Sequence, residues 1–593
     1  MDRHYRQLSA AEVQQLEMQG NFCTDWASVM VADGFNATYL RNNTFEDVVY
    51  IGAIGHGKVT DGDLILREGI YNSTLANCTV GDHPAIQNVH MLSGYTVGDN
   101  VILFNIDEMT CTADPHSVAW LEPMNENGGR RLLPFSGMTI GEAYMWARYR
   151  GHKAFIDKLE KMTYDTLATD EGRYGRVGDC CVIKNTKTLH NVTVRSKADD
   201  RSRIEGCIVL SDGVVGTGCT LEHGVIAVRF LLGEHVHLEF GLRLNDTVVG
   251  DNSTLARCEV GNSIIFPAHE QHHNNSFLIA GLIMGQSNIA AGGTIGSNHN
   301  SRTADNEIVG GRGFWPGLCC SFKHSSRFAS YCLLAKGDYP AELDITLPFA
   351  LVNNNVSKDC LEIMPAYWWM YNMYAMDRNS KKFAKRDKRV VKAQHIEFDN
   401  LAPDTAEEIF RGMNQLRAWM AASTTDTVYA QGQEKGKRPT VVLKAAEGLK
   451  AYEDMLVFYA MKYLPQPNSD HIKQNTKEWV NIGGQLVAKQ DMEQLIADVE
   501  SGVLGDWRAI RARFDALWEA YPAQREAHAY SVLCRLAGVD TLTDDLWQQY
   551  QKRYTEIQKY IEEQKVASRH KDEVNIFRNM TYWDDAERAA VLD

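Results

Sequence analysis

The chain has 593 residues, of which 44% are hydrophobic and 23% charged, and this composition excludes a disordered or collagen-like protein. Its net charge of −15 argues against nucleic acid as a partner, because binding to phosphates needs a basic surface. No run of 18 apolar residues occurs, so we expect no membrane-spanning helix and no membrane partner.

The first region, residues 1–47, is expected to form a helical cap. Apolar residues at Val13, Leu16 and Met18 follow Ser9 and indicate a short amphipathic helix. This polar N-terminus lacks the features of a signal peptide. The thirteen cysteines form no CxxC pair, so we expect reduced, mostly buried thiols in a cytoplasmic protein.

The second region, residues 48–352, contains a degenerate repeat with a period close to six. The clearest stretch places one aliphatic residue in each repeat, at Leu232, Leu238, Leu244, Val249, Leu255 and Val260. A period of six is neither helical nor strictly alternating, and it fits short strands separated by tight corners rich in Gly, Asn and Asp. Three such strands make a triangular coil, and stacked coils bury one continuous column of aliphatic side chains.

The units VGDN at 97–100 and 249–252 and VGNS at 260–263 resemble the hexapeptide-repeat superfamily of left-handed parallel β-helix proteins. This resemblance implies a left-handed parallel β-helix, a homotrimer with sites in the clefts between subunits, and acyltransferase activity. The order of the whole chain also resembles an uncharacterised bacterial family, described as a domain of unknown function, in which a β-helix precedes a helical carboxyl half. That second resemblance implies no activity.

Two helical regions accompany the repeat. The spacing of apolar residues predicts a helical insertion at about 130–180, on the outside of the column. Residues 353–593 are predicted to form an α-helical C-terminal region, without the persistent heptads of a coiled coil. Its aromatic residues around Trp368 and Trp369 are interpreted as core or as a stacking surface. The basic run from Arg378 to Arg389 is a solvated helix face or an anion-binding segment.

Polar breaks in the repeat between 266 and 327 are the expected working surface, because loops on a rigid scaffold often carry function. His299, with Asn298 to orient it, is the predicted general base, since a histidine held in one tautomer can accept a proton. A corner histidine that bonds a neighbouring coil is the alternative.

Further residues of this window are predicted to contact the substrate. His269, His272 and His273 fit substrate contact, metal binding or a solvated loop, and because their spacing matches no known zinc motif we expect no metal. The remaining predicted contacts, which suit a phosphate or carboxylate unless they are ordinary surface charge, are Arg302, Arg312, Lys323, His324 and Arg327.

These features favour a transferase-like enzyme that moves an acyl group from a coenzyme A thioester to a sugar or sugar nucleotide, with acyl-coenzyme A as co-substrate. The first alternative is a protein that binds a sugar nucleotide or glycan without catalysis. The second is a structural or assembly module whose helical half recruits a partner. A shared fold does not decide among the three.

Overall fold

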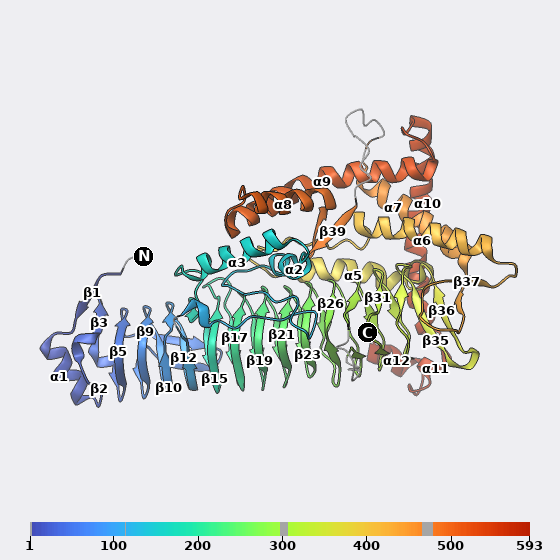
Figure 1. The fold of residues 1–593 in the computed structure, drawn as a ribbon. Helices are drawn as coiled ribbons and strands as arrows, with labels where there is room; N and C mark the ends of the chain where they lie inside the picture. Colours follow the sequence, from blue (N-terminus) through green and yellow to red (C-terminus); the bar gives the residue numbers. More distant parts are fainter. Residues whose placement is uncertain (1–2, 113, 297–305, 465, 467–477, 593) are drawn as a thin grey trace.

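The computed structural model describes residues 3–112, 114–296, 306–464, 466 and 478–592, and its main body is a long parallel β-solenoid (Figure 1). Thirty strands form one sheet in which each coil pairs with the next. For example, β21 (Arg243–Val249) pairs in parallel and in register with β19 (Ile226–Leu232) before it and β23 (Glu259–Ile265) after it. The predicted parallel β-helix is therefore confirmed, and its left-handed sense stays a prediction.

Each coil has three flats, which we number by one representative coil. Flat 1 is β20 (His237–Glu239), flat 2 is residues 243–245, and flat 3 is residues 247–249. The last two belong to the single strand β21, which bends at Asp246, where φ is +46°. Corners of this kind favour Asn, Asp and Gly, because other side chains are strained at positive φ.

Asparagines at successive corners also bind one another along the solenoid. The Asn42 amide donates to Asn72 Oδ1 at 3.1 Å, and the Asn72 amide donates to Asn88 Oδ1 at 3.0 Å. All three residues have positive φ. These ladders add side-chain hydrogen bonds between coils at the corners, beside backbone bonds such as that from Asn72 N to the Arg41 carbonyl.

The interior of the coil is the predicted aliphatic column. Leu232, Leu238, Leu244, Val249, Leu255 and Val260 are all buried in one continuous core. Cysteines take interior positions as well, nine of the thirteen are buried, and none forms a disulfide. Burial raises the pKa of Cys78 and of Cys181 to about 12, so both are neutral thiols.

The N-terminal cap consists of α1 (Ala10–Met18), whose Ser9 and Glu12 form a capping box, and its Leu16 is buried against the end of the coil. Strands join the solenoid before residue 48, because β2 (Phe22–Cys23) and β3 (Val29–Ala32) both pair with β5 (Thr44–Ile51). The cap proper is therefore shorter than residues 1–47.

The helical insertion covers flat 3. It follows β12 (Ile102–Thr110), contains α2 (Ile140–Arg148) and α3 (Lys153–Leu167), and returns to the solenoid at β13 (Arg176–Val177). Below it, the outward side chains of flat 3 form an apolar column that is buried beneath these helices: Val214, Leu231, Val248, Ile264 and Leu282. In Figure 1, α2 and α3 lie along the solenoid and α8 and α9 lie above them.

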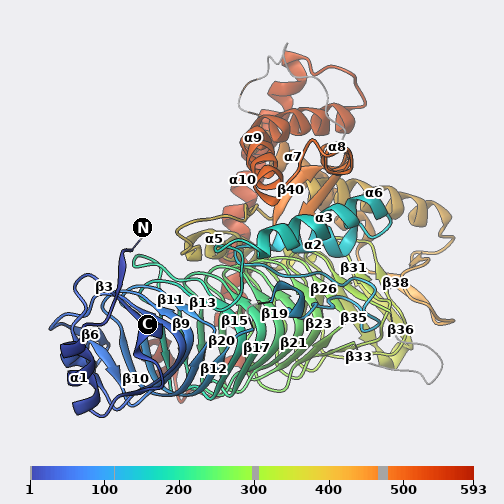
Figure 2. The same ribbon diagram turned by 60° about the vertical axis from the view of Figure 1, so that its left-hand side comes forward.

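The C-terminal region begins after β36 (Cys360–Met364) and is mainly helical, with a small β-hairpin, β39 (Trp479–Ile482) and β40 (Gln485–Ala488). Figure 2 shows its helices rising from the C-terminal part of the solenoid. Its helices are α4 (Tyr367–Tyr371), α5 (Met373–Arg386), α6 (Pro403–Ala422), α7 (Ala445–Tyr463), α8 (Lys489–Ser501), α9 (Trp507–Ala537), α10 (Asp544–Glu573), α11 (Ile576–Asn579) and α12 (Asp585–Leu592).

The aromatic segment at the start of this region contributes to the core. Trp368 and Trp369 are buried on α4, as the core interpretation expects. Within the described residues, the structure contains no helix with the length and apolar character needed to cross a membrane.

Candidate functional site

The predicted base and its neighbours cannot be placed, since Asn298, His299 and Arg302 lie outside the described residues. Their roles stay predictions. The other predicted residues are described, and they do not converge on one cleft.

The histidine loop divides between the interior and the surface of the solenoid. His269 is fully buried, with Nδ1 at 2.8 Å from Ser287 Oγ and Nε2 at 3.2 Å from Gln271 Oε1. Burial lowers the pKa of His269 to about 4, so its imidazole is neutral. His272 and His273 lie outside with their rings tilted at 49° to each other, and His272 lies 3.1 Å from Glu270. Among the described residues, no group of three or more His, Cys, Asp or Glu side chains could hold a metal ion.

The predicted anion contacts are occupied by protein carboxylates. Arg312 is 1% exposed and donates to Asp404 Oδ1 at 2.8 Å and to the carbonyl of Asp399 at 2.6 Å, which ties a solenoid corner to the start of α6. Lys323 pairs with Glu342 at 3.3 Å, and Arg327 pairs with Asp344 at 2.8 Å.

His324 is buried, and its imidazole lies against Gly296. None of these four predicted residues, Arg312, Lys323, His324 and Arg327, lines the cleft described next.

A different cleft forms where the solenoid, the insertion and α9 meet. It has a volume of about 530 Å³ and is lined by four cationic side chains, Arg176, Arg195, Lys197 and Arg511, and by two carboxylates, Glu171 and Asp179. Three of the cations belong to two neighbouring coils of the solenoid, and Arg511 comes from α9. We call this cavity the basic cleft. Its size is within the usual range for small-molecule sites.

The cations of the basic cleft differ in how far they are already paired. Arg511 donates to the buried Glu142 at 2.8 Å and to the Gly137 carbonyl at 2.9 Å. Arg176 donates to the Asp170 carbonyl. The Arg195 guanidinium forms no hydrogen bond or ion pair within the described part of the chain, and burial together with the nearby Arg511 lowers its pKa. The Lys197 ammonium is also unpaired among the described residues, but it is exposed to solvent. Arg195 is therefore the cation best placed to bind a ligand.

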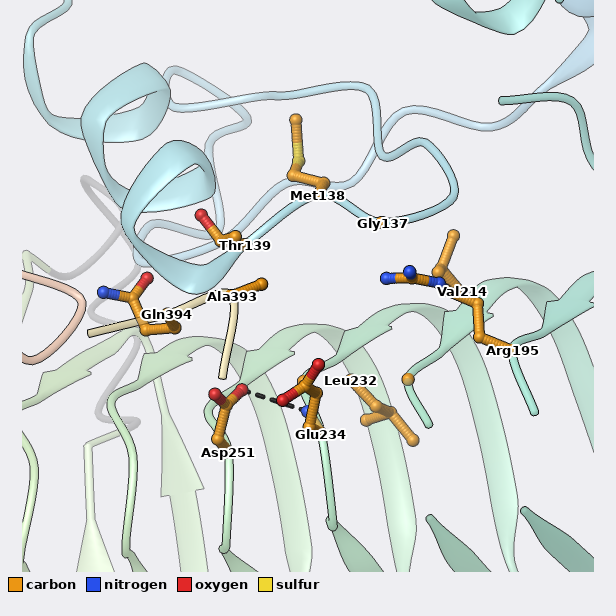
Figure 3. Close-up of a pocket in the computed structure, with 12 residues that line it drawn as sticks. Gly137, Met138, Thr139, Arg195, Val214, Leu232, Glu234, Asp251, Ala393 and Gln394 are labelled. Carbon is orange, nitrogen blue, oxygen red and sulfur yellow. Dashed lines mark hydrogen bonds between the residues drawn. The ribbon is translucent and has the colours of Figure 1, made fainter. Parts of the chain in front are cut away.

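A small enclosed pocket adjoins the basic cleft, and Gly137 and Arg195 line both (Figure 3). It holds about 20 Å³, enough for a water molecule. Figure 3 shows Glu234 and Asp251 on the floor, Arg195 to one side and the segment leading into α2 above. The wall opposite Arg195 is formed by Ala393 and Gln394.

Glu234 is the group in this pocket with unusual electrostatics. It is 5% exposed, and its Oε2 accepts a hydrogen bond from the Lys392 backbone at 3.1 Å. Its Oε1 has no partner among the described residues. Burial, followed by the nearby Asp251 carboxylate, raises the pKa of Glu234 to about 7. This carboxyl group can therefore gain and lose a proton near neutral pH.

Asp251, one coil further along, holds the pocket in shape. Its Oδ1 accepts from the Glu234 backbone at 3.0 Å, and its Oδ2 pairs with Arg389 at 2.6 Å. Arg389 also binds Asp387 at 2.8 Å and the Gln394 carbonyl. These bonds fix residues 387–394 as the closing wall of the pocket.

Comparison with known proteins places this chain in a family. A family model described as Domain of unknown function (DUF4954) matches residues 5–420. The chain belongs to this family. It is also 41% identical over 653 aligned positions to an uncharacterised protein of Treponema pallidum (strain Nichols), and the alignment covers 100% of this chain and 90% of the relative. Neither description assigns an activity, so any functional conclusion depends on the site.

The matched range of the family includes Arg195, Glu234 and Asp251 but ends before α9 and its Arg511. Sequence reasoning missed this site because it treated VGDN at 249–252 as turn chemistry alone. The available signal was the pair Gly233-Glu234 and Gly250-Asp251, which places carboxylates at the same corner of adjacent coils. Two adjacent carboxylates that are buried by a covering segment raise each other's pKa, because burial and the neighbouring negative charge both disfavour the ionised form.

Proposed function

We propose that this protein is a transferase-like enzyme that binds a phosphate-bearing small molecule in the basic cleft and uses Glu234 to transfer a proton. One observation carries the proposal: a buried carboxyl group with an unpaired oxygen and a pKa of about 7 lines a small pocket that adjoins the basic cleft and shares Arg195 with it. Perturbed acids of this kind are concentrated at catalytic sites.

The cations favour an anionic substrate. Arg195 has a free guanidinium, which can bind two phosphate oxygens at once, and Lys197 adds a second positive charge at the same corner. Sugar nucleotides and coenzyme A both carry phosphates that suit these groups. The basic cleft is wide enough for part of such a molecule, while the enclosed pocket admits only a small group.

Acyl transfer is the reaction we propose at this site. In its ionised form Glu234 would take the proton from a sugar hydroxyl or amine as that group attacks the thioester carbonyl. The new C–O or C–N bond forms, the C–S bond breaks, and the protonated Glu234 returns the proton to the departing sulfur, so that coenzyme A leaves as a thiol and Glu234 is ionised again. A base with a pKa near 7 suits this step at neutral pH. The role of His299 as base stays a prediction that this proposal does not use.

We also propose that the protein is a homotrimer. Flat 2 supports this, because several of its outward side chains are apolar and partly exposed: Val209, Ile226, Val228, Phe277 and Ile279. Arg243 and Glu259 occupy the same outward position on the two coils between Ile226 and Phe277. Three solenoids packed side by side could bury such faces. Light scattering on the purified protein would give the mass of the assembly.

The proposed function is tested first by measuring ligand binding and then by measuring the reaction itself. Thermal shift with pyrophosphate, a nucleotide sugar and acetyl-coenzyme A should show stabilisation by at least one of them. Arg195→Ala should weaken that binding about tenfold, as expected for one charge-assisted contact, whereas the control Arg41→Ala, an exposed residue on flat 1 that does not line the cleft, should not change it.

The acyl transfer itself is tested by measuring the free thiol that acetyl-coenzyme A releases when the bound sugar nucleotide is present. Glu234→Gln should bind the ligands and lose thiol release. Binding without turnover in the unsubstituted protein would favour a sugar-nucleotide or glycan-binding protein. Absence of any stabilisation would refute the proposal and favour an assembly module.

A further inference from the structure

We infer that the helical half contains a second ligand site, for a long-chain aliphatic carboxylate, in an apolar cavity between α5, α7 and α10. This inference does not depend on the proposed function. The cavity has a volume of about 460 Å³ and is lined by side chains from four separate segments of the C-terminal region. A cavity of this size is in the range that binds small molecules.

The walls of the cavity are apolar and adaptable at one end. Met373 and Met376 of α5 face Phe458 of α7 and Ile561 of α10, and Trp369 packs on Phe458 with ring centroids 5.9 Å apart. Methionine side chains adjust to irregular shapes, which suits a flexible hydrocarbon chain better than a rigid ring system.

The other end of the cavity is polar, because the character of α5 changes along its length. Ser380 and Lys381 follow Met376 by about one turn, and Asn400 and Lys462 line the same cavity. An amphiphile lying along α5 would therefore place its tail near Met373 and its head near Ser380. The two ends of the cavity match the two ends of such a molecule.

Asn400 adds an uncommitted amide group to the cavity. It is 9% exposed, and its carboxamide has no hydrogen-bond partner among the described residues. It lines both this cavity and a narrow extension of about 20 Å³ that leads toward the solenoid corner at Gly313 and Tyr331. The amide group is therefore free to bond to solvent or to the polar head of a ligand in the cavity.

The spare hydrogen-bonding capacity at the polar end consists mainly of donors. Asp399 accepts from both Lys462 and Tyr463 and is already well paired. Lys381, 68% exposed, uses one of its three N–H donors on Asp377 at 2.8 Å, and Lys462 is 41% exposed. Together with the Asn400 amide, these groups favour an acceptor-rich, negatively charged head, which is a carboxylate.

The test is a fluorescence titration of the full chain with cis-parinaric acid, followed by displacement with oleate, hexadecanol or dodecylamine. We expect saturable binding and displacement by oleate. Ala384→Trp should weaken parinarate binding at least tenfold, because Ala384 is exposed at the polar end and a large side chain there blocks entry. The matched control is Lys385→Trp on the same helix, whose side chain is exposed and does not line the cavity.

A second variant keeps the test decisive if Ala384→Trp fails to fold, as judged by circular dichroism. Lys381→Glu should weaken oleate binding about tenfold and leave hexadecanol binding unchanged. Lack of saturable parinarate binding, equal affinity in the Ala384 variant, or displacement by dodecylamine as readily as by oleate would overturn the inference. Arg195→Ala should leave parinarate binding unchanged, so failure at the basic cleft and failure here are distinguishable.

Discussion

Replacement of Glu234 by Gln gives a test of the candidate site that needs no substrate. In the folded protein, burial and the Asp251 carboxylate favour the neutral form of Glu234, with a pKa of about 7 against an ordinary value of 4.5. A group whose pKa is raised by folding contributes its full stability below its unfolded pKa and loses it as pH rises through the folded value. The free energy of unfolding of the unsubstituted protein should therefore fall between about pH 4.5 and 7. Glu234→Gln should not show the share of this fall that Glu234 causes.

The magnitude follows from the same two pKa values. A difference of about 2.5 pKa units corresponds to ~3 kcal/mol at 1.36 kcal/mol per unit. Because relaxation and water entry reduce such penalties in real proteins, we expect about 2–3 kcal/mol. In Glu234→Gln the amide atom at the Oε1 position also lacks a partner, and this lowers the free energy of unfolding by the same amount at every pH. The constant loss cancels when the two proteins are compared at two pH values.

The measurement is urea unfolding at pH 4.5 and pH 8, followed by circular dichroism, for the unsubstituted chain and the variant. The stability difference between the two proteins should change by about 2–3 kcal/mol between these pH values in favour of the variant. The control is Glu519→Gln, an exposed residue on α9, for which no such change is expected. A Glu234 variant whose stability difference is the same at both pH values would refute the raised pKa and with it the proton-transfer role.

Three other substitutions test the architecture by urea unfolding at pH 7. Arg389→Met leaves the buried Asp251 without its partner and should destabilise the protein by about 3–5 kcal/mol; full stability would mean that the pair is not formed. Asn72→Ala and Asn72→Gly both break a corner ladder, but only alanine keeps a β-carbon at a φ of +52°, so Asn72→Ala should cost about 1–2 kcal/mol more than Asn72→Gly. Gly213→Ala would bring a β-carbon to 2.3 Å from the Phe230 ring and should cost about 1–3 kcal/mol; adding Phe230→Leu should recover part of this loss, and additive effects would contradict the contact.

The solenoid could be predicted from sequence because its determinants are local. Each flat needs one inward aliphatic residue, such as Leu238, and each corner needs a residue that tolerates positive φ, such as Asn252. Both requirements recur every few residues and are visible without knowledge of which segments pair. The helical insertion was predictable for the same reason, since the apolar spacing around Phe155 and Leu159 is helical and both residues are buried.

The candidate site could not be predicted in the same way, because its chemistry is produced by contacts between distant segments. Glu234 is an ordinary corner carboxylate until the segment before α2 and residues 387–394 cover it. Arg195 and Arg511 are separated by more than three hundred positions in the chain and meet only in the folded molecule. Conversely, His269 is chemically suggestive in sequence, yet the coil uses it as a hydrogen-bonded interior residue.

The cover over flat 3 links the stability of the fold to the chemistry of the site. The outward column that includes Leu231 and Val248 is apolar and would be exposed on a bare solenoid, so α2 and α3 are needed to bury it. The chain that leads into α2 passes over the adjacent corner, where Gly137 and Thr139 close the pocket above Glu234 (Figure 3). The same packing that removes apolar surface from water thus removes water from one carboxyl group and raises its pKa. A change that loosens the insertion should therefore return Glu234 toward ordinary acidity even where no residue of the pocket is altered.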